Sequence, residues 1–413
     1  MSANRTPAQI VTEAARQWLV VNDDQLPVVP LVVAVANRLP GPPVWLIMVA
    51  ASSWGKSDLV MPVTGLPGVH FISKVTDKTF ASGKKRESSD PRHLSLLERF
   101  KSEKTWLVAI KDLGTIQSLP PLTRNGIFGQ LREIYDGQYS ADYGTGVHVQ
   151  WKGKLGVLAA ATNVIDDYTK WSAELGERFV YFRLKRTPQA LVAARAMRAV
   201  DDGVDDGRAR ALAAAFAEAF VVADEVVKGS GVPVAPPEET LVVRTVAELM
   251  VEARTPIKRT NDDGYEVEES EGTGRVTKVL AQIHRAAAIV YGGDWQQATA
   301  PVVRIGLDSA PRKRMATLRV LARCPQGVTV ERLATELRCD ANTATRHAND
   351  LVSLGFAEKD RPANRPVYRP SIKLQNYAEA ISLDEYLGDD ALRKLFDLPG
   401  DLTPAREREI VVA

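Results

Sequence analysis

The segment Ala50–Ser57 restricts the fold of this 413-residue chain more than any other feature. It reads Ala-Ala-Ser-Ser-Trp-Gly-Lys-Ser and continues an apolar run, Val44–Ala51, that has the length of a buried strand. A strand that stops at a tight loop, with a helix beginning at the lysine, directs successive backbone N–H groups towards one point. The positive end of the helix adds to the attraction for anions. The pattern therefore predicts a phosphate-binding loop.

Each residue type in this loop has a defined task. Lys56 is expected to contact the β- and γ-phosphates of a nucleoside triphosphate, and the Ser57 hydroxyl to ligate Mg²⁺. The other residues expected around the nucleotide are Ser52, Ser53, Trp54, Gly55 and Asp58. The bulk of Trp54 and the presence of a single glycine are departures from the usual pattern, and a coincidental loop is the alternative interpretation.

Three further apolar runs indicate the rest of a sheet. They are Trp106–Ile110, Leu155–Ala161 and Phe179–Leu184. Strands that alternate with helix-capable stretches favour an α/β fold, in which helices cover a mainly parallel sheet. We predict such a core over residues 44–188, preceded by an N-terminal helical segment over residues 1–43.

Polar residues near the ends of these runs are the candidates for catalysis. Asp112 can polarise water or hold Mg²⁺, although Lys111 stands where a second carboxylate would help. Glu133 is a reserve candidate, with a solvated helix position as the alternative. Asn163 can orient the attacking water or simply cap a turn. Arg178, expected to be exposed before the fourth strand, can reach a neighbouring subunit's γ-phosphate or form a surface salt bridge.

The composition changes after Pro188. Ala190–Val227 is rich in alanine, and helical periodicity returns over Leu241–Val251 and Val276–Tyr291. We interpret residues 189–310 as a helical lid.

A compact pattern of short elements begins at Pro311. The expected helices are Arg312–Arg323, Val330–Leu337 and Ala341–Leu354, and the expected strands are Phe356–Glu358 and Val367–Arg369. Asp340 can cap the third helix, and Gly355 can end it. Three helices followed by a hairpin predict a winged helix over residues 311–373.

The charge of the C-terminal part is uneven. Residues 311–373 hold 13 Lys and Arg against 6 Asp and Glu, whereas residues 384–413 hold 4 against 8. A basic module before an acidic tail, here residues 374–413, is typical of a nucleic-acid-binding part followed by an interaction segment. The tail is therefore a candidate site for a protein partner.

Four residues of the predicted winged helix suit contact with duplex DNA. Thr343 and Arg346 share one face of the third helix with Asp350, and residue types of this kind reach base edges from a major-groove helix. Arg361 and Arg365 stand in the wing, where arginine can contact phosphates. A winged helix that packs on protein is the alternative.

Several other classes of protein are disfavoured. No apolar run approaches the roughly 18 residues of a membrane helix, and the first residues lack the apolar stretch of a signal peptide. Cys324 and Cys339 match no zinc pattern and fit a reducing compartment. We therefore expect a cytoplasmic protein without a membrane partner.

The order of these motifs resembles the AAA+ ATPases, and within them the helicase and initiator branch of the minichromosome-maintenance helicases, as found in phages and integrated elements. The resemblance runs from about Val44 to Leu184 and extends more weakly through residue 310 to the winged helix. It implies hydrolysis of ATP with Mg²⁺ at the subunit interfaces of a ring, which in this branch is a hexamer. It also implies that Asn163 is sensor 1, Arg178 the arginine finger and Arg275 sensor 2.

Helicases of this branch also place a hairpin between the positions of Asp112 and Asn163, with a lysine directed towards DNA in the pore. Here Tyr139–Trp151 has strand-like residues on both sides of a turn at Tyr143–Gly146. Lys152 and Lys154 are the nearest basic residues. They stand at the base of the hairpin, so a solvated strand edge is the alternative to DNA contact.

Three functions are compatible with these features. The first is an ATP-driven DNA motor, a replicative helicase or replication initiator of a phage or mobile element. The second is a winged-helix DNA-binding regulator in which ATP only switches assembly. The third is a signalling ATPase whose winged helix contacts protein. The order of the motifs favours the first, and Lys111 keeps the second open.

Overall fold

The computed structural model describes most of the chain in two compact units, Met1–Met315 and Ala316–Ala413. The described residues are 5–19, 21, 23–51, 55–84, 95–167, 178–185, 188, 190–193, 197, 205–259, 264–362 and 365–381. Among them, no helix is both long and apolar enough to cross a membrane.

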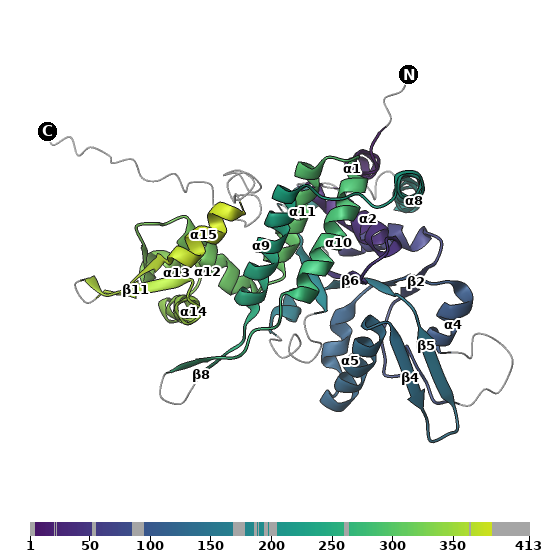
Figure 1. Ribbon diagram of the computed structural model, residues 1–413, viewed down its shortest axis with the longest axis horizontal. Helices are drawn as coiled ribbons and strands as arrows, with labels where there is room; N and C mark the ends of the chain where they lie inside the picture. The colour runs from purple at the N-terminus through teal and green to yellow at the C-terminus, as the bar shows by residue number, and fades with distance from the viewer. Residues whose placement is uncertain are drawn as a thin grey trace. The chain divides into compact units, whose positions relative to one another are not determined.

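The first unit is built on a five-stranded parallel sheet with the order β2-β3-β6-β1-β7 (Figure 1). The strands are β1 (Trp45–Val49), β2 (Val69–Ile72), β3 (Leu107–Ile110), β6 (Gly156–Ala161) and β7 (Phe179–Arg183). Every residue of β1, β3 and β6 is buried, as expected of parallel strands covered on both faces. The predicted α/β class with a parallel sheet is confirmed.

The order of the strands in this sheet determines where a site can form. The strands β6 and β7 are consecutive along the chain, yet in the sheet they lie on either side of β1. In open parallel sheets, ligands bind outside the carboxyl ends of the strands at such a reversal of strand order. We call the residues that follow Val49, Ile110 and Ala161 the carboxyl edge, and those that precede Trp45, Gly156 and Phe179 the amino edge.

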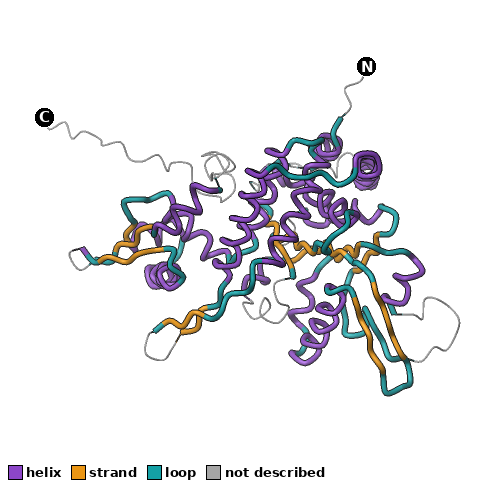
Figure 2. Tube along the Cα trace, in the orientation of Figure 1, coloured by secondary structure: helices purple, strands orange, loops and turns teal. Residues whose placement is uncertain are grey.

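Shorter helices connect the strands. They are α3 (Lys56–Val60), η1 (Met61–Gly65), α4 (Leu96–Glu103), η3 (Leu113–Ser118), α5 (Pro121–Tyr135) and η4 (Asn163–Asp167), where η denotes a 3₁₀ helix. An antiparallel hairpin of β4 (Gln138–Asp142) and β5 (His148–Lys152) follows α5, and Figure 2 shows it extending away from the sheet.

The N-terminal segment forms helices α1 (Pro7–Trp18) and α2 (Gln25–Arg38). A capping box between Thr6 and Gln9 begins α1. Every residue of α2 from Leu26 to Asn37 is buried, and a helix that is apolar all round belongs in a core. Helix α2 is therefore a core helix, although Pro30 lies inside it.

Among the described residues, four long helices complete the first unit. They are α8 (Asp205–Ser230), α9 (Pro237–Arg254), α10 (Gly274–Val290) and α11 (Trp295–Asp308), with a small hairpin of β8 (Ile257–Arg259) and β9 (Tyr265–Val267) between α9 and α10. Helix α10 packs on α2, α9 and α11, and α11 also packs on β7. Helix α8 packs mainly on α1 and η1.

The second unit contains short helices and a three-stranded antiparallel sheet. Its elements are α12 (Arg312–Ala322, which begins in the first unit), β10 (Val328–Thr329), α13 (Val330–Leu337), α14 (Ala341–Ser353), β11 (Ala357–Asp360), β12 (Val367–Pro370) and α15 (Ile372–Ala380). The strand order is β10-β12-β11. The Asp340 side chain accepts a hydrogen bond from the Thr343 backbone N–H and begins α14. Leu333, Leu351 and Phe356 are buried in the core.

Candidate nucleotide-binding site

Lys56 lies where β1 passes into α3, at the carboxyl edge. Gly55 precedes it with φ at +73°, a backbone conformation that favours glycine. The Lys56 ammonium donates hydrogen bonds to the carbonyl oxygens of Ala50 at 2.8 Å and Ala51 at 2.5 Å. The side chain therefore folds back over the start of the predicted loop. Ser52, Ser53 and Trp54 lie outside the described residues.

Asp112 follows β3 at the same edge, and its negative charge interacts with the Lys56 ammonium. Burial lowers the pKa of Lys56, and the negative charge of Asp112 partly offsets this effect. The Asp112 Oδ1 atom accepts a hydrogen bond of 2.8 Å from the Gly114 backbone N–H. A Cβ atom on Gly114 would lie 2.9 Å from that oxygen and 3.9 Å from the Thr162 hydroxyl. Glycine thus keeps open a small space beside both oxygen atoms.

Asn163 supplies a third polar side chain at the carboxyl edge. It is the first residue of η4, separated from the end of β6 by Thr162, and it is exposed. The register pairs Val49 with Ala161, so the loops after β1 and β6 begin at the same level. The fold therefore gathers Lys56, Asp112 and Asn163 at one edge.

The first turn of α3 also receives an arginine from the helical part of the unit. Ser57 is exposed, and Asp58 forms an ion pair with Arg208 of α8, with 3.4 Å between Asp58 Oδ1 and Arg208 Nη2. Arg208 was not predicted as a site residue. The sequence indicates only a helix there, because a contact across 150 residues leaves no local pattern.

Arg178 differs from its expected state. Only 8% of its side chain is exposed, so the expectation of an exposed arginine was wrong. Its Nη2 atom lies 2.8 Å from Asp136 Oδ2, and its guanidinium lies over the Tyr135 ring at 5.4 Å. Tyr135 in turn packs edge-on against Trp45, the first residue of β1. Aromatic and acidic residues at the end of α5 therefore hold Arg178 at the amino edge.

Arg275 lies near the same tyrosine. It is paired with Glu271 at 2.6 Å. Burial raises the pKa of Tyr135 to about 12, and the charges of Arg275 and Arg178 reduce this rise. Tyr135 and Lys56 lie towards opposite ends of β1, a strand roughly 13 Å long from its rise per residue. The structure thus brings Arg275 together with Arg178, not with Lys56.

The reserve candidate Glu133 also lies away from Lys56. It is exposed on α5, two residues before Tyr135. This position matches the solvated helix surface that was its alternative.

The hairpin of β4 and β5 is present, with Gln138 paired with Lys152 at its base. Lys152 is exposed. Lys154 is not: its ammonium donates to the Leu39 carbonyl oxygen at 2.6 Å and to that of Ala36 at 3.4 Å. The last carbonyls of a helix lack partners within it, and Lys154 supplies one for α2. The prediction that Lys154 contacts DNA therefore conflicts with its position.

The residues predicted to contact DNA in the second unit differ in their surroundings. Arg346 is exposed on α14, whereas Thr343 is half-buried and donates from its hydroxyl to Asp340 at 2.6 Å. Arg361 and Arg365 are exposed on either side of residues 363 and 364, which lie outside the described residues.

No protein-family model and no curated protein matches this chain. Similar solved structures include an active helicase, Cch of SCCmec type IV, at 11% identity and a TM-score of 0.37, over 91% of this chain and 71% of the helicase. Another is the ORC2 protein of Aeropyrum pernix with ADPNP and ADP, at 13% identity and a TM-score of 0.25, over 87% of this chain and 93% of ORC2. Both scores are low, so the functional argument rests on the geometry of the site.

Proposed function

We propose that this chain is an ATPase of the AAA+ type that acts on DNA as a replicative helicase or replication initiator. One observation carries the proposal: Lys56, Asp112 and Asn163 all follow strands at the carboxyl edge, next to β1, where the strand order reverses. A cation, a carboxylate and an amide at this position match the needs of phosphoryl transfer, which depends on positioning and on charge stabilisation.

The groups at this edge have separable roles. Lys56 would exchange the carbonyl oxygens of Ala50 and Ala51 for the β- and γ-phosphate oxygens. Asp112 would hold the attacking water or accept a proton from it, and Asn163 would orient the same water. Asp58, paired with Arg208, would connect the nucleotide to α8.

The same edge offers ligands that suit Mg²⁺. The Ser57 hydroxyl and the Asp112 carboxylate are hard oxygen donors, and Gly114 leaves space beside the carboxylate. Mg²⁺ keeps several waters and needs few protein ligands when phosphates are present. When bound, the ion would neutralise charge on the phosphates.

Arg178 and Arg275 would serve a neighbouring subunit. Both lie at the amino edge, and each is paired with a carboxylate of its own subunit. In a ring, one subunit's amino edge would face the next subunit's nucleotide, and the γ-phosphate would compete with Asp136 for Arg178. We propose a homo-oligomeric ring, which for a helicase of this branch is a hexamer.

The second unit would supply the DNA contact. Its helices α12, α13 and α14 and the hairpin of β11 and β12 follow one another as in a winged helix. In this proposal Arg346 faces base edges and the two wing arginines contact phosphates. Thr343 would contribute less, because its hydroxyl already donates a hydrogen bond to Asp340, the residue that caps α14.

The test is the ATPase rate of the full-length protein with and without single- and double-stranded DNA, together with unwinding of a forked duplex. We expect hydrolysis that DNA stimulates and unwinding that requires ATP. Replacing Arg361 or Arg365 with alanine should weaken DNA binding for all sequences and flatten its salt dependence, because each neutralised phosphate releases counterions. An absence of both ATP binding and hydrolysis would contradict the proposal.

A regulator that uses ATP only as a switch is the second candidate. The observation that favours it concerns Asp112. Its carboxylate already accepts a hydrogen bond from Gly114, and the neighbouring exposed residue is Lys111 rather than a second carboxylate. Specific duplex binding with very slow turnover and no unwinding would support this candidate over the motor.

A further inference from the structure

A half-buried arginine, Arg183, links the turn after β6 to helix α11. Arg183 ends β7 and is paired in register with Val49, the last residue of β1. Its Nη1 and Nη2 atoms lie 2.9 Å and 2.7 Å from the two carboxylate oxygens of Asp166. The two side chains are 14% and 22% exposed. This bidentate geometry is the strongest form of arginine–carboxylate pairing.

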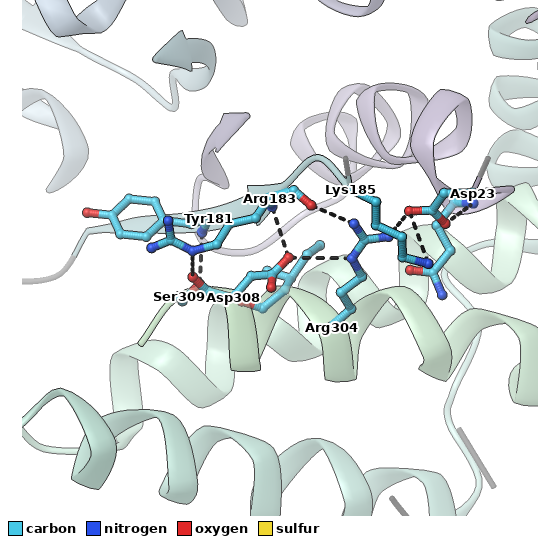
Figure 3. A network of polar contacts seen from close by, with 9 residues as sticks. Asp23, Tyr181, Arg183, Lys185, Arg304, Asp308 and Ser309 are labelled. Carbon is cyan, nitrogen blue, oxygen red and sulfur yellow. Dashed lines mark hydrogen bonds and ion pairs between the residues drawn. The ribbon is translucent and has the colours of Figure 1, made fainter. Parts of the chain in front are cut away.

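The same residue is fixed to the helical part of the unit. Its Nε atom donates to the Asp308 carbonyl oxygen at 2.8 Å, and its backbone N–H donates to the Asp308 carboxylate at 2.9 Å. Asp308 is the last residue of α11. Figure 3 shows Arg183 lying directly beside Asp308 and Ser309.

A second arginine, Arg304, holds the backbone of Arg183. Arg304 of α11 is 1% exposed, donates to the Arg183 carbonyl oxygen at 2.5 Å and lies over the Phe182 ring at 4.0 Å. It also pairs with Asp23, which precedes α2 (Figure 3). The backbone of Arg183 is thus held on one side while its guanidinium reaches Asp166 on the other.

Asp166 belongs to η4, the five-residue turn that begins with Asn163. The strands β6 and β7 flank β1, so the pair between Arg183 and Asp166 joins the last residue of β7 to the turn after β6, on either side of the strand that leads to Lys56. We propose that Arg183 is a positioning residue, which sets the turn that carries Asn163 and connects it to α11. This inference rests on the proposed ATPase function.

The proposal predicts a separation of rate from affinity. Lys56 and the phosphate-binding loop have no hydrogen bond to this network among the described residues, so nucleotide binding should persist without it. A displaced Asn163 would orient the attacking water poorly, and small displacements of this kind reduce the chemical step strongly. The loss should therefore appear in kcat rather than in KM.

The experiment compares full-length Arg183→Lys and Asp166→Asn with the wild-type protein. Lysine keeps the charge but lacks the fork, and asparagine keeps the shape but lacks the charge. We expect kcat to fall roughly ten- to a hundredfold and the affinity for a fluorescent ATP analogue to change less than about threefold. The matched control is Arg314→Gln, which removes a half-buried arginine that donates to the Ala253 and Thr255 carbonyls, and it should leave kcat unchanged.

A double substitution makes the test independent of stability. If Arg183 acts through Asn163, Arg183→Lys should lower kcat little further in an Asn163→Ala background. Full multiplication of the two losses would overturn the inference, as would a wild-type kcat in both single variants. A parallel loss of ATP affinity, melting temperature and kcat would also overturn it and leave a structural role. If one variant fails to fold, the other carries the same test. A wild-type protein that does not hydrolyse ATP would instead contradict the proposed function.

Discussion

The two edges of the parallel sheet differ in how their charged residues are held. At the carboxyl edge, Lys56 is bonded only to two backbone carbonyls in the part of the chain described, and Asn163 is exposed. At the amino edge, Arg178 is buried between a carboxylate and an aromatic ring. The first arrangement can exchange its partners for a ligand at small cost. The second is stable within one subunit, and it would change only when a stronger anion arrives.

The largest effect is expected at the carboxyl edge. Lys56→Ala removes the cation that we propose contacts the β- and γ-phosphates, so ATP turnover should fall by more than about a thousandfold. The melting temperature should stay close to the wild-type value, because the side chain is only half-buried. A steady-state ATPase assay and thermal melting check both points, and a wild-type turnover rate would place the site elsewhere.

Arg178→Ala tests the amino edge. Loss of an arginine that stabilises transferred phosphate costs about a thousandfold in turnover, and ATP binding should survive. Mixing this variant with Lys56→Ala should restore activity at composite sites, since each variant supplies what the other lacks. Wild-type protein that stays monomeric with ATP and DNA would refute an action between subunits.

A smaller loss is expected for Asp112→Asn. An amide cannot accept the proton of the attacking water, so kcat should fall roughly a hundredfold. The amide oxygen can still accept the hydrogen bond from Gly114, so the turn after β3 should persist. The Glu133→Gln variant is the control at the other edge, and its kcat should equal that of the wild type.

The smallest effect concerns stability at the amino edge. Burial lowers the pKa of Lys154 to about 8, below its value in the unfolded chain. Between about pH 8 and pH 10 the unfolded state then binds more protons at this residue, so its contribution to the free energy of unfolding should rise with pH. Urea titrations of the wild type and of Lys154→Met at about pH 8 and pH 10 measure this effect. The free energy of unfolding of the wild type should increase relative to that of the variant at the higher pH. Equal DNA affinity of the two proteins would show that Lys154 does not contribute to DNA binding.

Local patterns predicted the centre of the fold well. The apolar runs before Lys56, Asp112 and Asn163 contain β1, β3 and β6, because strands buried on both faces are continuously apolar. β2 was missed, since it lies at the edge of the sheet and Phe71 within it is exposed. The α/β class follows from the buried strands alone.

Residues that act across long sequence distances were not predictable. Arg183 meets Asp308 across 125 residues, and Arg208 meets Asp58 across 150. The burial of Arg178 depends on Tyr135 and Asp136, which the local sequence around Arg178 does not indicate. The sequence indicated which residues lie at strand ends, but it did not indicate which of these residues form ion pairs or hydrogen bonds with distant elements.

Helix α2 has a consequence for synthesis of the chain. A large part of its apolar surface packs on α10, and Gln282 donates a hydrogen bond to the Ala36 carbonyl across 246 residues. At roughly 5–20 residues per second, α2 would leave the ribosome about 12–50 s before that partner exists. During this interval an apolar helix must avoid aggregation, which makes the nascent chain a candidate client for a chaperone. Slowing translation between residues 40 and 270 should therefore lower the yield of folded protein.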